Sequence, residues 1–134
     1  MKPLVDLRFH SDRQTGVLDQ LVLAELIRGG GYDRHVRRSR ARYRRRRDAL
    51  LGVLQTGHTA SGIAAGLHVV VSLPPGRTEA EVLDAAARRG VGVDAMARHH
   101  RSPGPHPQRL IVGYGAPPDH AFPAALREFR AVLG

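Results

Sequence analysis

The chain has 134 residues, 42% of them apolar, which suffices for one domain with a real core and excludes wholesale disorder. It contains no cysteine, so disulfides, thiolate metal sites and cysteine nucleophiles are excluded together. The net charge of +9 is uneven, because nine arginines lie between Arg34 and Arg47. No apolar run approaches the ~20 residues of a membrane helix, and the N-terminus lacks the features of a signal peptide. We therefore expect a cytoplasmic protein without membrane contact.

Two helices are predicted in the first part of the chain. Apolar residues over 14–27 follow the helical period, and the three glycines at 29–31 end that segment. A longer helix is predicted over 32–55, closed by residues 56–59 and followed by a loop of small residues over 61–66. Its apolar line contains Val36, Tyr43, Leu50 and Leu54. We expect the arginines to occupy the remaining, solvated face.

Three strands and two further helices are predicted in the second part. The strands cover residues 67–73, 91–95 and 109–115, where β-branched residues or alternation occur. Thr78 and Glu81 form the pattern of a capping box, which predicts a helix that runs to about Arg88. Residues 98–108 hold three histidines and three prolines and read as a loop. The last helix is predicted over 120–133, with Asp119 as its N-cap and Phe122, Leu126, Phe129 and Leu133 buried.

The predicted order is therefore two helices, a strand, a helix, two strands and a helix. A three-stranded, mainly antiparallel sheet with helices on one face is an α+β fold. The pattern contains no repeat and no linker, so we assign residues 1–134 to a single domain.

The composition suggests nucleic-acid binding and metal binding, but the spacing of the residues favours neither. Clustered arginines neutralise phosphates, but apart from Tyr43, which falls on the apolar line, no aromatic is interleaved with them, and no helix-turn-helix spacing is present. A solvated face is the better reading, and we do not expect direct DNA binding. Three histidines, His99, His100 and His106, lie in the predicted loop with no close carboxylate and no helical pairing, so no metal site is predicted.

Several blocks resemble the C-terminal part of the aminotransferase-like regulators, the MocR/GabR branch of the GntR family. These blocks are LDQLVLAE at 18–25, GYDRHVRR at 31–38, YRRRRDAL at 43–50, AGLH at 65–68 and LIVGYG at 110–115. Their order and spacing match that family over nearly the whole chain, and more loosely the pyridoxal-phosphate aminotransferases of fold type I. The resemblance implies the small C-terminal domain of that fold, with long N-terminal helices.

The resemblance also implies what surrounds such a domain. An intact family member looks like a winged-helix DNA reader joined to an aminotransferase-like module, in which pyridoxal phosphate forms a Schiff base with a lysine of the large domain. The small domain closes over an amino-acid-like effector, and dimers share the site. We expect the winged helix and the cofactor-binding large domain to be absent from this chain. The partner is then a second copy or the missing large domain.

The single lysine limits what the chain can do by itself. Lys2 precedes the first matching block and lacks the flanking residues expected around a Schiff-base lysine. Such a lysine must be held beside a preorganised phosphate site. We therefore predict no catalytic residue here, and we expect no cofactor to bind this chain alone.

Arg109 is the one residue with an expected role in binding. In aminotransferases an arginine on a strand of the small domain pairs with the substrate carboxylate, and Arg109 precedes the matching block in a similar setting. In strict register the family arginine falls nearer Ile111. Alternation places 109 and 111 on one strand face, so Arg109 could still point toward the effector. An exposed arginine at the edge of a strand is the alternative.

Three functions follow as hypotheses. The first is a truncated effector domain of a pyridoxal-phosphate-dependent transcription regulator, inactive alone. The second is a fragment of a metabolic aminotransferase. The third is a stand-alone basic protein that binds nucleic acid.

Overall fold

The computed structural model of the chain describes residues 16–63, 66–102 and 104–134. The chain divides into two compact units, Met1–Arg40 and Ala41–Gly134, and each unit is described by itself. The assignment of a single domain to residues 1–134 stays a prediction. No helix of the described segments is long and apolar enough to cross a membrane.

The first unit contains helix α2 (Val17–Arg28) and the beginning of helix α3 (Gly31–Gly52). The predicted glycine stop is confirmed: Gly29 caps α2, and Gly30 has a φ of 66°, in the left-handed region that glycine adopts without strain. None of the residues of α2 is buried, and Leu18 is 74% exposed. The large apolar side chains of α2 are therefore largely exposed within the described part of this unit.

The second unit is built on an antiparallel sheet with strand order β1-β2-β4-β3. The strands are β1 (Thr59–Ser61), β2 (His68–Ser72), β3 (Asp94–Ala95) and β4 (Arg109–Gly113). The α+β class and the antiparallel sheet are confirmed, but the predicted number of three strands was wrong. Strand β1 was missed because its three residues, Thr-Ala-Ser, are exposed and give no apolar alternation.

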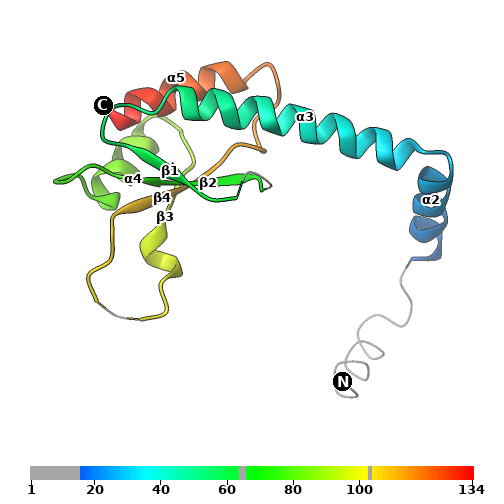
Figure 1. Cartoon of the computed structure of the whole chain (residues 1–134), viewed down its shortest axis with the longest axis horizontal. Helices are drawn as coiled ribbons and strands as arrows, with labels where there is room; N and C mark the ends of the chain where they lie inside the picture. Colours follow the sequence, from blue (N-terminus) through cyan, green and yellow to red (C-terminus); the bar gives the residue numbers. More distant parts are fainter. Residues whose placement is uncertain (1–15, 64–65, 103) are drawn as a thin grey trace. The chain divides into compact units, whose positions relative to one another are not determined.

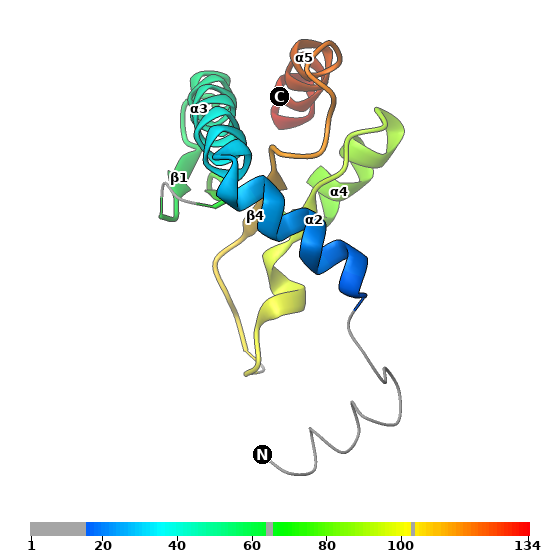
Figure 2. The ribbon, with the colours of Figure 1, turned by 90° about the vertical axis from the view of Figure 1, so that its right-hand side faces the viewer.

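Helices cover one face of this sheet (Figure 1, Figure 2). They are the end of α3, helix α4 (Glu79–Arg88) and helix α5 (Phe122–Leu133). The buried core joins sheet residues to helix residues: Val69, Val71, Leu110 and Val112 from the strands, and Leu50, Val82, Phe129 and Val132 from the helices. Because alternate residues of β2 and β4 enter this core, the residues between them point to the opposite face, here named the open face.

The ends of the helices test the predicted caps. The capping box of α4 is confirmed, since Glu81 N donates to the Thr78 hydroxyl at 3.3 Å and Thr78 N donates to the Glu81 carboxylate at 2.9 Å. The N-cap of α5 was predicted wrongly: that helix follows Ala121, and Asp119 instead accepts a hydrogen bond from Arg46. Helix α3 ends at Gly52, earlier than predicted.

Candidate functional site on the open face of the sheet

Arg109 begins β4 and belongs to the open face. Leu110 and Val112 are buried in the core, so Arg109 and Ile111 lie together on the other face, as alternation predicted. The Arg109 side chain is half-buried, and its Nε has no hydrogen-bond partner among the described residues. Because this Nε is itself shielded from solvent, a carboxylate that pairs with Arg109 must use the terminal nitrogens of the guanidinium. The role of Arg109 in binding stays a prediction.

The strand register defines the neighbours of Arg109. Ser72 of β2 lies opposite Arg109, and Val70 lies opposite Ile111. On the other side of β4, Asp94 of β3 lies opposite Ile111. The open face therefore has an apolar centre, with the guanidinium at one end and a carboxylate at the outer strand. This surface can hold an apolar body and a charged group together.

The backbone of Arg109 is fixed by a buried carboxylate. Glu79, 5% exposed at the start of α4, accepts from Arg109 N at 2.8 Å and from Ala97 N at 3.0 Å. Glu79 N in turn donates to the Gln108 side-chain oxygen at 2.9 Å. The first turn of α4 thereby connects the beginning of β4 to the segment after β3. The sequence reading missed this residue, although Glu79 precedes Val82 and Ala86 at helical spacing and so lies on the buried face of α4.

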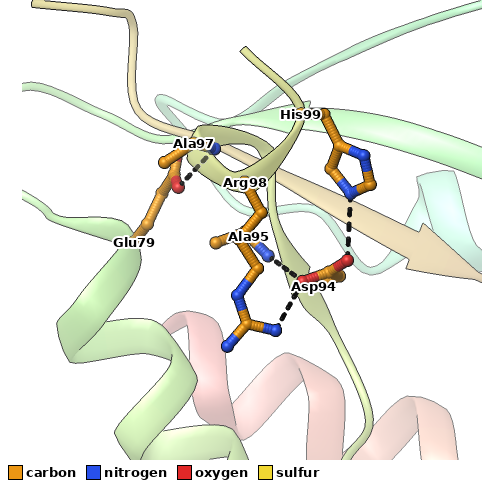
Figure 3. Close-up of polar contacts among 6 residues, drawn as sticks. All are labelled: Glu79, Asp94, Ala95, Ala97, Arg98 and His99. Atoms are coloured by element: carbon orange, nitrogen blue, oxygen red, sulfur yellow. Dashed lines mark hydrogen bonds and ion pairs between the residues drawn. The ribbon is translucent and has the colours of Figure 1, made fainter. Parts of the chain in front are cut away.

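A second polar cluster surrounds Asp94 (Figure 3). Asp94 accepts from its neighbour Ala95 N at 2.9 Å, pairs with Arg98 at 3.3 Å and lies 3.0 Å from His99 Nε2. The prediction that the histidine loop has no close carboxylate was therefore wrong for His99. Residues 96–99 form a 3-10 turn, η1 (Met96–His99), which overlaps the start of the predicted loop, and this turn brings Arg98 and His99 back to Asp94.

Hydrogen bonding controls the protonation of Asp94. The hydrogen bond from His99 is the main cause that holds the Asp94 pKa below its usual value, aided by Ala95 N and the Arg98 charge and opposed by desolvation. The other two histidines of the segment stack on each other, with ring centroids of His100 and His106 3.7 Å apart. Within the described segments, no group of three or more histidine or acidic residues is arranged to hold a metal ion.

Replacing Asp94 by Asn should flatten the pH dependence of stability at acid pH. A carboxyl whose pKa is lower in the folded state stabilises the fold above the unfolded pKa of ~3.9, and that contribution is lost as the pH falls through the folded value. We expect the free energy of unfolding of Asp94→Asn to decline less than that of the parent below about pH 4. Urea unfolding at a series of pH values measures this, with the exposed Asp84→Asn as control. Identical slopes for Asp94→Asn and the parent would contradict the assignment.

Arg46 departs from the solvated arginine face that the sequence predicted. It is 5% exposed, and its Nη1 donates to the carbonyl oxygens of Tyr114 at 3.2 Å and Gly115 at 3.1 Å. Its Nη2 lies 2.6 Å from the Asp119 carboxylate, and its guanidinium carbon lies 4.6 Å from the ring centroid of Phe122. Arg46 therefore ties α3 to the segment between β4 and α5. The sequence carried a signal, because Arg46 follows Tyr43 by three residues and precedes Leu50 by four.

The other arginines of this segment fit the prediction better. In the first unit Arg34, Arg37, Arg38 and Arg40 are exposed. In the second unit Arg44 and Arg45 are exposed, while Arg42 and Arg47 are half-buried. Direct DNA binding by these residues stays untested.

Comparison with solved structures identifies the fold of the chain. The chain superimposes with a TM-score of 0.76 on LysN, an α-aminoadipate aminotransferase from Thermus thermophilus in complex with N-(5′-phosphopyridoxyl)-L-leucine. The match covers 98% of this chain and 34% of that enzyme, at 21% identity. The fold of the chain is therefore that of a small domain of an aminotransferase, as the sequence predicted.

A regulator matches the chain in sequence. Over 100 residues the chain is 31% identical to the uncharacterized HTH-type transcriptional regulator YhdI of Bacillus subtilis (strain 168), a match that covers 72% of this chain and 21% of the regulator. No protein-family model matches the chain. The resemblance to the C-terminal part of aminotransferase-like regulators is thus confirmed, while the chain spans a minor part of both relatives.

Proposed function

We propose that the chain is a truncated effector domain of a pyridoxal-phosphate-dependent transcription regulator and that it is inactive alone. Two similarities together support the proposal. The sequence of the chain is similar to that of a transcriptional regulator, and its fold is similar to about one third of an aminotransferase. In an intact parent its role is to close over an amino-acid-like effector and to complete a dimer.

The open face supports a role in effector binding. Arg109 lies half-buried on this face, and Glu79 holds its backbone in place. Val70 and Ile111 provide half-buried apolar surface beside it. A carboxylate of the effector pairs with the Arg109 guanidinium, and the apolar part of the effector lies along the sheet.

The exposed helix α2 supports a role in assembly. Its large apolar side chains lack cover within the described residues of the first unit: Val17, Leu18, Leu21, Val22, Leu23, Leu26 and Ile27. Contiguous exposed apolar surface marks interaction sites. In this proposal α2 packs against the large domain or against a second copy of the chain.

The described residues do not fit pyridoxal phosphate by themselves. A Schiff base requires a lysine amine, and the chain's single lysine, Lys2, lies outside the described residues. We expect no Schiff-base absorbance band when pyridoxal phosphate is added to the purified chain. A stable band in the parent that disappears in Lys2→Arg would contradict the proposed inactivity.

The origin of the chain is tested by its coding DNA. We expect the DNA on the 5′ side of Met1, read in three frames, to encode a lysine-containing cofactor segment preceded by a winged helix. A cofactor segment without a winged helix would favour the metabolic aminotransferase instead. The absence of both would remove the basis of the proposal.

A further inference from the structure

The second unit contains a cavity that lies on the helical side of the sheet, away from the open face. Its volume is about 190 Å³. Strand β4 and the residues after it, helix α5 and the turn after α4 form its walls. The main lining residues are apolar: Val91, Val112, Tyr114, Phe122, Leu126 and Phe129.

Small residues keep this space empty. Gly92 and Ala125 both line the cavity. A Cβ atom added at Gly92 would meet no described heavy atom within 4 Å, and the backbone there is outside the left-handed region. Ala125 lies on α5 between the lining residues Phe122 and Phe129. Gly92 is exposed, so the open space beside it faces solvent, whereas a larger side chain at the half-buried Ala125 would occupy part of the cavity.

A buried charge holds the wall in place. Arg46 donates to the Tyr114 carbonyl oxygen and stacks on the Phe122 ring, and both of these residues line the cavity. Because the guanidinium also bonds Gly115 and Asp119, the segment that leads from β4 to α5 is fixed at several points. The cavity wall is therefore preformed, which lowers the entropic cost of binding.

The charged groups that line the cavity satisfy each other. Arg89 and Glu128 form an ion pair at 3.1 Å, with side chains 46% and 49% exposed, so the pair lies where the cavity meets solvent. An uncharged ligand leaves this pair intact. No other charged side chain among the described residues lines the cavity, so a charged ligand would find no free partner there.

We propose that this cavity binds an uncharged apolar molecule with the size of about one six-membered ring. An engineered apolar cavity of ~150 Å³ in another protein binds benzene, and the cavity found here has a similar volume, although it opens to solvent beside the Arg89–Glu128 pair. The ligand enters past the Arg89–Glu128 pair and packs between Val112, Phe122 and Phe129. This site goes beyond the proposed function and does not depend on it, because all its residues lie in the second unit.

Titration of the full chain with toluene, followed by amide NMR, tests the proposal. We expect saturable shifts at Gly92, Gly113 and Ala125, and at least a tenfold loss of affinity in Ala125→Leu, whose side chain fills the cavity. Ala124→Leu, at the exposed neighbouring position of α5, should bind toluene like the parent. Ala125→Val adds fewer atoms at the same position and provides a second filling variant should Ala125→Leu fail to fold.

Three results would overturn the proposal. They are the absence of saturable shifts up to the solubility of toluene, parent-like affinity in both filling variants, and shifts confined to the apolar residues of α2. Tighter binding of benzoate than of toluene would overturn the uncharged class of ligand. None of these results bears on the regulator origin of the chain, which the coding DNA tests separately.

Discussion

Replacing Arg46 by Met should lower the free energy of unfolding by about 2–4 kcal/mol. The substitution leaves the buried carbonyl oxygen of Tyr114 and the half-buried one of Gly115 without their donor and removes the stacking on Phe122. Asp119 contributes less to this loss, because its side chain is 70% exposed and regains water. Urea unfolding of the full chain measures the difference.

Two further variants test whether the positive charge or the hydrogen-bond geometry of Arg46 explains the loss of stability. Arg46→Lys keeps the positive charge but loses the planar fork that reaches two carbonyl groups and a carboxylate, so we expect it to recover only part of the loss. Arg45→Met removes an exposed arginine of the same helix and should change stability by no more than ~0.5 kcal/mol. Equal effects of Arg45→Met and Arg46→Met would show that helix charge, and not the buried network, sets the stability.

Replacing Glu79 by Ala should destabilise the second unit by about 2–4 kcal/mol, because two backbone N–H groups lose their acceptor at once. Those groups belong to Ala97 and Arg109, and their distances to the carboxylate are 3.0 and 2.8 Å. Glu79→Gln keeps one acceptor oxygen but turns an NH2 group toward the second N–H. We expect its loss of stability to be intermediate.

Hydrogen exchange makes the Glu79 prediction specific to two residues. The amides of Ala97 and Arg109 should lose protection in Glu79→Ala more than other amides of the second unit. Asp84→Ala, which removes an exposed carboxylate of the same helix, should leave both amides protected. A uniform loss of protection across the unit would argue that Glu79 acts only through global stability.

The strongest periodic signals predicted the fold well. Strands β2 and β4 lie in the predicted apolar, β-branched segments, and the capping box of α4 follows from the Thr78–Glu81 spacing, because these patterns reflect local backbone geometry. The failures concern residues whose partners are distant in the chain. Asp119 is a good N-cap by type, but it pairs with Arg46, 73 residues earlier, and no local pattern reports such a contact.

The candidate site was predicted in part for the same reason. Alternation correctly placed Arg109 and Ile111 on one face of β4. The contact of Glu79 with the Arg109 backbone depends on how β4 and α4 assemble, whereas His99 reaches Asp94 through the local turn η1, which composition did not reveal. Residue types and spacing alone do not predict the order of the strands in the sheet or the position of α4 against them.

The outermost strands of the sheet are also its shortest. Strand β1 has three residues and β3 has two, while the inner strands β2 and β4 have five each. Unpaired edges of long flat strands template the growth of cross-β fibres, and short edges offer few backbone groups for such templating. Precipitates of this chain should therefore form through helix contacts and stay amorphous, without binding dyes that report amyloid.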